Sequence, residues 1–98
     1  MKSYDCPAYL SLRNFFDAAL SVQSPLRVRN GAGEIQTCET PQQIWDAVEC
    51  AEEGYVYVRR GDEKATFWII PENGSDALTD YSDNEFAEEI LTLAKSHD

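Results

Sequence analysis

Two runs of strand-forming residues joined by a polar turn constrain the fold of this 98-residue chain more than any other feature. Residues 55–58 (Tyr-Val-Tyr-Val) and 65–70 (Ala-Thr-Phe-Trp-Ile-Ile) are rich in aromatic and β-branched side chains, and 60–63 (Arg-Gly-Asp-Glu) is typical of a turn. This pattern predicts an antiparallel hairpin at the centre of a sheet. A second hairpin is expected over residues 26–37, where apolar residues alternate with arginines before the turn Asn-Gly-Ala-Gly.

Three stretches have the spacing of amphipathic helices. Apolar residues recur at three- and four-residue steps from about residue 8 to 22, after Pro7. Thr40, Pro41 and Gln43 form a capping box with proline at the first helical position, which predicts a helix over about 41–53. We expect Gly54 to end this helix in the left-handed conformation.

A second capping box, Ser82-Asp83-Asn84-Glu85, predicts that the last helix begins there. Its expected inner stripe consists of Phe86, Ile90, Leu93 and Ala94. Between the second hairpin and this helix, residues 76–81 are expected to form a short fifth strand, with Leu78 buried and Tyr81 as a second candidate for burial.

The expected architecture is one α+β domain over residues 1–98, with element order α-β-β-α-β-β-(β)-α. A single antiparallel sheet of four or five strands would carry three helices, mainly on one face. Hydrophobic residues make up 43% of the chain, which is ordinary for a globular protein that folds by itself.

The chain is strongly acidic, with 18 Asp and Glu against 8 Lys and Arg and a net charge of −10. Such a surface repels nucleic acids and anionic lipid headgroups, so we expect no direct binding to nucleic acid or membranes. No stretch has the roughly 20 apolar residues that span a bilayer, and no signal peptide is evident, so we expect a cytoplasmic protein.

Most of the imbalance lies in the last quarter of the chain, since residues 72–98 contain eight acidic residues and one basic residue. These acids could serve solubility alone, or they could form a docking surface for a basic partner. Acids at the start of a helix also gain from the helix dipole. The candidate partner-binding residues are Asp76, Asp80, Asp83, Glu85, Glu88 and Glu89.

Four aromatic residues are candidate interface anchors or, alternatively, ordinary packing residues: Trp45, Tyr55, Tyr57 and Trp68. The arginines concentrate on the two expected hairpins, at Arg27, Arg29, Arg59 and Arg60. A polarised charge distribution is therefore expected.

The residues that support common enzyme mechanisms are missing from the pattern. The single histidine, His97, lies next to the last residue, so no positioned base is expected for a Ser or Cys nucleophile. No glycine-rich phosphate loop, calcium loop or zinc-binding cysteine pair is present, so we expect no catalytic residues, metal site or cofactor. The odd count of cysteines, Cys6, Cys38 and Cys50, indicates reduced thiols, two of them on core faces.

The run Phe-Trp-Ile-Ile-Pro-Glu-Asn-Gly at 67–74, followed by Asp-Ala-Leu-Thr-Asp-Tyr-Ser at 76–82, resembles short acidic accessory proteins of phages and mobile elements. The resemblance implies an anti-restriction or anti-CRISPR type of inhibitor. Such an inhibitor would be a non-enzymatic nucleic-acid mimic that occupies a basic, nucleic-acid-binding surface of a protein or nucleoprotein complex in phage defence.

Two alternatives stay open. An immunity protein that neutralises a basic toxin nuclease would use the same electrostatic match. A structural or regulatory accessory module would carry its acids for solubility only, and self-association would favour this alternative.

Overall fold

The computed structural model describes residues 10–50 and 52–95. In chain order the elements are α1 (Leu10–Val22), β1 (Leu26–Asn30), β2 (Ile35–Cys38), α2 (Pro41–Cys50), β3 (Gly54–Arg60), β4 (Glu63–Ile69), the 3-10 helix η2 (Pro71–Asp76), β5 (Leu78–Tyr81) and α3 (Glu85–Lys95). The predicted order, including the fifth strand, is therefore confirmed.

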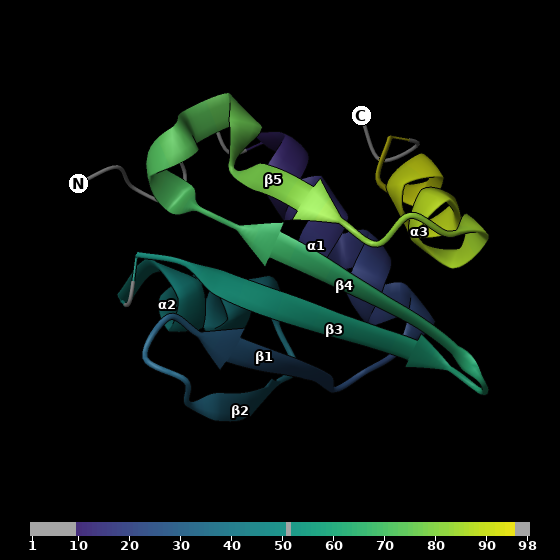
Figure 1. Ribbon diagram of the computed structural model, residues 1–98, viewed down its shortest axis with the longest axis horizontal. Helices are drawn as coiled ribbons and strands as arrows, with labels where there is room; N and C mark the ends of the chain where they lie inside the picture. The colour runs from purple at the N-terminus through teal and green to yellow at the C-terminus, as the bar shows by residue number, and fades with distance from the viewer. Residues whose placement is uncertain (1–9, 51, 96–98) are drawn as a thin grey trace.

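The five strands form one antiparallel sheet in the order β2-β1-β3-β4-β5. Figure 1 shows α1 and α2 behind the sheet and α3 beside β4 at the edge of this helical layer, so the strands in front leave the other face of the sheet open. The edge strands β2 and β5 have four residues each, whereas the central strands β3 and β4 have seven. This is the expected α+β architecture, with two hairpins joined through α2.

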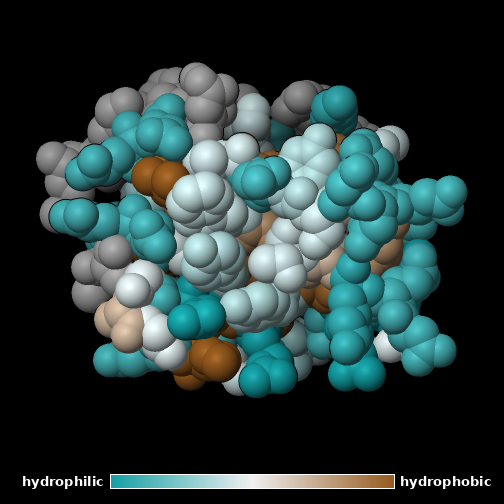
Figure 2. Space-filling model, in the orientation of Figure 1, coloured by the Kyte–Doolittle hydropathy of each residue, from teal (hydrophilic) through white to brown (hydrophobic). Residues whose placement is uncertain are grey.

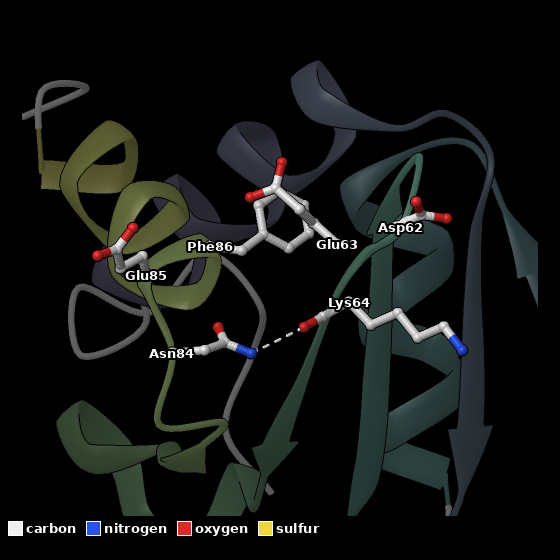
Figure 3. A pocket seen from close by; sticks show the side chains of 6 residues that line it. All are labelled: Asp62, Glu63, Lys64, Asn84, Glu85 and Phe86. Carbon is white, nitrogen blue, oxygen red and sulfur yellow. Dashed lines mark hydrogen bonds between the residues drawn. The ribbon is translucent and has the colours of Figure 1, made fainter.

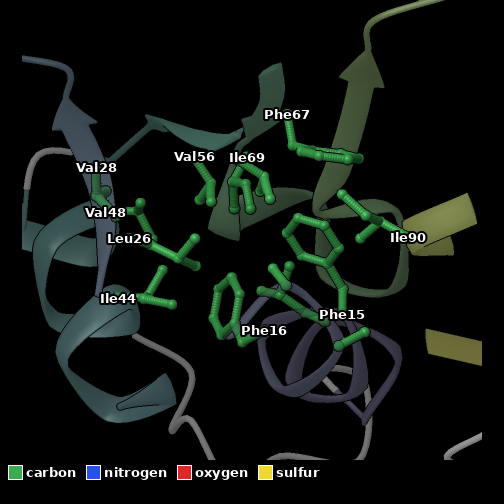
Figure 4. Close-up of a cluster of buried hydrophobic side chains, with 14 of the residues drawn as sticks. Phe15, Phe16, Leu26, Val28, Ile44, Val48, Val56, Phe67, Ile69 and Ile90 are labelled. Atoms are coloured by element: carbon green, nitrogen blue, oxygen red, sulfur yellow. The ribbon is translucent and has the colours of Figure 1, made fainter. Parts of the chain in front are cut away.

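The side chains that point toward the helices form the core, which Figure 4 shows at the junction of sheet and helices. Phe15 and Phe16 of α1 are fully buried, and the ring of Phe15 lies 4.5 Å from that of Phe67 on β4, measured between centroids. Val28 and Val56 face them from the neighbouring strands β1 and β3. Large apolar surfaces from all three helices and the sheet thus share one core.

The capping box of α2 forms as predicted. The backbone N–H of Gln43 donates to Thr40 Oγ1 at 3.2 Å, and the side chain of Gln43 accepts from the N–H of Thr40 at 3.3 Å. Two N–H groups that the first turn of a helix leaves without partners are satisfied in this way.

The predicted end of α2 at Gly54 was wrong. The helix ends at Cys50, and Glu52 adopts the left-handed conformation with φ of 65°. Gly54 instead begins β3, where a Cβ would lie 2.4 Å from Val48 Cγ1. Glycine is required at this position because α2 packs closely against the strand.

The predicted start of α3 was also wrong in its capping residue. Asn84, not Ser82, caps the helix, because Asn84 Oδ1 accepts from the N–H of Ala87 at 2.8 Å. The Ser82 hydroxyl oxygen instead accepts from the N–H of Thr66 at 2.9 Å, so Ser82 joins the chain after β5 to β4. The helix begins at Glu85.

Two residues predicted in the core are not buried. Leu93 is 37% exposed, because the buried face of α3 is centred on Ile90 and Ala94 and includes Ala87. Tyr81 is 41% exposed at the edge strand β5, although its ring still stacks on Phe67. Leu78 is half-buried.

Several sequence predictions fall on residues outside the described ranges, namely those for Pro7, Cys6 and His97. Cys38 is buried, as expected for a core-facing thiol, whereas the side chain of Cys50 is not described. Within residues 10–50 and 52–95, the helices lack the combined length and apolar character that crossing a membrane requires.

Candidate functional site

Helix α3 carries three of the predicted partner-binding carboxylates on one side. Glu85, Glu88 and Glu89 are separated by three and four residues, a spacing that places them on a single face of a helix, and all three are exposed. The opposite side is fixed by Phe86 and Ile90, which are 3% and 0% exposed. The carboxylates are therefore presented by a rigid, well-anchored element.

The exposed Asp83 lies two residues before the start of this helix. We call Asp83, Glu85, Glu88 and Glu89 the acidic α3 surface. Because the helix begins at Glu85, both Glu85 and Glu88 belong to its first turn, where the positive end of the dipole stabilises negative charge. The structure thus supplies a local reason for Glu88 that the sequence prediction had not found.

Glu89 has a different local partner. Arg60, at the end of β3, forms ion pairs with both Glu89 and Glu63, and its Nη2 lies 3.1 Å from Glu89 Oε1 and 3.0 Å from Glu63 Oε1. The same guanidinium lies over the ring of Phe86, 5.0 Å from the centroid. Its hydrogen bond lowers the pKa of Glu89 below the ordinary value. The carboxylate of Glu89 therefore stays ionised to lower pH, and the positive charge of Arg60 partly neutralises it.

A shallow, open hollow lies between the start of α3 and the β3–β4 turn (Figure 3). Asn84 bridges the two elements, since its Nδ2 donates to the backbone oxygen of Lys64 at 2.9 Å. In Figure 3 the side chain of Lys64 extends away from Glu85 and Phe86. Asp62 of the turn and Glu63 at the start of β4 add carboxylates to the rim, so the acidic character continues from α3 onto the hairpin.

The remaining two predicted residues do not join the acidic α3 surface. Asp80 lies on β5 opposite Trp68, on the open side of the sheet, and its Oδ1 accepts from the N–H of Tyr81 at 2.8 Å. Asp76 ends η2, and its side chain lies outside the described part of the structure. Of the five predicted residues whose side chains are described, four form the acidic α3 surface and Asp80 lies on the open side of the sheet.

The open sheet face is defined by the strand residues that point away from the helices. The pairing of the strands places Ile35, Arg29, Tyr55, Trp68 and Asp80 in one row across the sheet. A second row contains Thr37, Arg27, Tyr57 and Thr66, and a third contains Arg59 and Lys64.

Aromatic rings occupy the centre of this face. Tyr55 and Trp68 are half-buried neighbours whose ring planes differ by 11° and whose centroids lie 6.2 Å apart. Figure 2 views the face from the front: side chains of intermediate hydropathy fill its centre, and hydrophilic side chains gather around them. The sequence prediction had named Tyr55, Tyr57 and Trp68 as candidate anchors, and the structure places all three here, whereas Trp45 is buried in the core at 5% exposure.

Cations lie on two sides of the aromatic centre. Arg27 lies directly opposite Tyr57, and Arg29 lies opposite Tyr55, both on β1. Arg59 and Lys64 face each other near the β3–β4 turn. Half of the chain's eight Lys and Arg residues are therefore on the open sheet face, while Asp80 is the one carboxylate among its outward-pointing strand residues described above.

Within the described ranges, no three His, Cys, Asp or Glu side chains are grouped so that they could hold a metal ion. Comparisons with protein families, curated proteins and solved structures found no match for this chain. The two charged surfaces are the features of the structure from which a function can be argued.

Proposed function

We propose that this protein is a non-enzymatic, protein-binding inhibitor whose acidic α3 surface occupies a basic, nucleic-acid-binding surface of a partner. The proposed setting is cytoplasmic, and the proposed target is a phage-defence complex of the CRISPR or restriction type. The observation that carries the proposal is the presentation of exposed carboxylates, Glu85 and Glu88, by a helix that is capped and packed on its other side.

Rigid presentation supports the proposal because a partner gains affinity when the docking groups are already in place. Glu85 and Glu88 lie at the positive end of the helix dipole, and the hydrogen bond from Arg60 lowers the pKa of Glu89; all three side chains are exposed. Residues one turn apart on α3 have Cβ atoms about 5 to 6 Å apart, so Glu85 and Glu88 place negative charges close together along one line, as the phosphates of a nucleic-acid strand do. Lysine and arginine side chains that bind phosphates can also bind carboxylates.

The test begins with a pull-down from host lysate at low and moderate salt, followed by identification of the captured protein by mass. We expect a basic protein or complex whose nucleic-acid binding competes with this chain. The purified chain should hydrolyse no nucleotide, nucleic acid or peptide at an enzyme-like rate.

The contribution of the acidic α3 surface is measured with the triple variant Asp83→Asn, Glu85→Gln and Glu88→Gln. Glu89 is left unchanged because it is bound to Arg60. The association rate with the captured partner should fall about tenfold or more at low salt, since the lost charges steer the encounter. The dependence of the rate on salt should also become weaker.

A matched control removes the same charge from exposed acids elsewhere, through Asp17→Asn, Glu34→Gln and Glu39→Gln. The control should retain most of the association rate. Equal losses in both variants would mean that only net charge matters. No loss in either variant would mean that the acids serve solubility, and the docking proposal would then be wrong.

A further inference from the structure

The open sheet face has the composition of a protein-binding surface rather than that of a solvated sheet. Its centre contains Tyr55, Tyr57 and Trp68, and its border contains Arg27 and Arg29. Tyrosine, tryptophan and arginine are the residue types most enriched at binding hot spots. None of these residues belongs to the acidic α3 surface, so this face needs its own explanation.

The charged groups on this face are four cations and one carboxylate, Asp80 on the edge strand β5, so the face as a whole is suited to an anionic ligand. Arg27, Arg29, Arg59 and Lys64 are all exposed hydrogen-bond donors, and like charges lie directly opposite each other at Arg59 and Lys64. Like charges in that position destabilise a sheet. A bound carboxylate between them would remove this repulsion.

The aromatic centre contains a covered polar group without a partner. The indole Nε1 of Trp68 is covered by neighbouring atoms and has no hydrogen-bond partner in the described part of the chain. A ligand that contacts the Trp68 ring therefore breaks no hydrogen bond of the indole. At the β2 edge of the same row, Ile35 leaves 53% of its surface exposed and extends the apolar contact.

Two other occupants are compared with a polypeptide. A second copy docked by the same face would bring the cations of both copies together. A nucleic acid would meet the same cations through its phosphates, so it is the alternative that the test separates from a polypeptide. A polypeptide is favoured because tyrosine, tryptophan and arginine are the side chains most enriched at protein–protein contacts.

We infer that the open sheet face is a docking site for an acidic, extended polypeptide segment of a partner protein. Arg29 on β1 and Lys64 on β4 are two strand spacings apart across the sheet and four residues apart along it, so about 16 Å, the length of about five extended residues, separates them. Carboxylates of the segment would contact the arginines of β1 at one side and Arg59 and Lys64 at the hairpin end. Its apolar groups would cover the rings of Tyr55, Tyr57 and Trp68.

The probe for this site is octa-glutamate with blocked ends, which is extended at neutral pH because its charges repel one another. The peptide is titrated into 15N-labelled protein while amide and indole signals are followed by NMR. The two tryptophans provide an internal comparison, since Trp68 lies on the face and Trp45 in the core. We expect saturable shifts at the indole of Trp68 and at the amides of Tyr55 and Arg29, with Kd of about 1 mM or tighter, and no shift at Trp45.

Variants then separate local recognition from general attraction. Arg29→Gln should weaken octa-glutamate about three- to tenfold, whereas Lys95→Gln, which removes one exposed cation from α3, should leave the affinity unchanged. Unchanged amide spectra in the absence of peptide confirm that both variants are folded. Equal effects of the two variants would overturn the assignment of the site to the open sheet face.

Octa-glutamine and an oligothymidylate of eight nucleotides complete the test. Octa-glutamine should cause no saturable shift, because it lacks carboxylates. Absence of shifts with octa-glutamate, or shifts confined to the helical layer, would overturn the inference. Binding of the oligothymidylate as tight as or tighter than that of octa-glutamate would also overturn it, since the occupant would then be a nucleic acid.

Discussion

Replacing Gly54 with alanine tests the close packing of α2 on the sheet. The new Cβ would lie 2.4 Å from Val48 Cγ1 and 3.0 Å from the backbone oxygen of Arg29. Val48 cannot turn away easily, because it is fully buried and β-branched residues in a helix have one strongly preferred rotamer. We therefore expect the helix and strand to be pushed apart locally.

The size of the effect follows from two opposing contributions. Overpacking of a close-packed site costs about 1 to 3 kcal/mol, and the reduced freedom of the unfolded chain returns about 0.4 to 1 kcal/mol. The net loss for Gly54→Ala should be about 1 to 2 kcal/mol, which lowers the Tm of a domain of this size by about 4 to 16 °C. Urea denaturation and thermal melting followed by circular dichroism measure both quantities.

The double variant with Val48→Ala identifies the cause of the loss. Removing the valine methyl groups makes room for the new Cβ, so the two changes should be less harmful together than their sum, by about 1 kcal/mol or more. Gly61→Ala is the control, because Gly61 has φ of 62° and no atom within 4 Å of the added Cβ. The stability lost in Gly61→Ala reflects backbone strain, and it should simply add to the stability lost in Val48→Ala. An unchanged Tm for Gly54→Ala, or simple additivity with Val48→Ala, would refute the packing argument.

Three further predictions concern local interactions. Asn84→Ala should lower the free energy of unfolding, measured by urea denaturation, by about 0.5 to 2 kcal/mol. Asn84→Ser should lose much less stability than Asn84→Ala, because serine can also cap the helix. Equal losses in the two variants would rule out capping. The folded-state pKa of Glu89 is lowered by Arg60, so the stability that Glu89→Gln removes should be present above the ordinary pKa of 4.5 and lost as pH falls through the folded-state pKa. Urea midpoints across this pH range check the sign, and a difference that grows toward low pH would contradict it. Burial and the charge of Asp46 raise the pKa of the Cys38 thiol. A thiol reagent should therefore label Cys38 far more slowly in the native protein than in urea, as measured by peptide mass mapping. Equal labelling rates would contradict this.

Features with a local physical cause could be predicted from the sequence. The capping box at Thr40 and Gln43 depends on residues only three apart, and it formed as expected. The alternation of Leu26 and Val28 with two arginines likewise gave the inward and outward sides of β1 correctly. In such cases the interacting residues are close together in the sequence, so the pattern is enough to predict the structure.

The errors arose where a residue's role depends on distant parts of the chain. Gly54 fits the pattern of a residue that ends a helix. Glycine is needed there for another reason, because the position lies against Val48 and pairs with Asn30 on β1. Ser82 matched a capping residue, but Thr66 of β4 uses its hydroxyl, and Asn84 caps the helix instead. Tertiary contacts decided between two chemically reasonable roles in each case.

The division of the candidate acids between two surfaces was not predictable either. Alternation along β5 places neighbouring residues on opposite sides, but it does not tell which side the helices cover. The pairing of Asp80 with Trp68 is needed to place this carboxylate on the open sheet face. Similarly, nothing in the sequence pairs Arg60 with Glu89, since 29 positions separate them.

The short edge strands of the sheet bear on how concentrated this protein can become. An exposed edge offers unpaired backbone groups to another chain, and long, regular edges lead to uncontrolled sheet growth. Here each edge has four residues, and on β5 the pairing shifts between Trp68 and Ile69, so that Thr79 is an extra residue that bends the edge. An inhibitor of the proposed kind would have to be made in amounts that match its target, and short, irregular edges would limit how much of it aggregates.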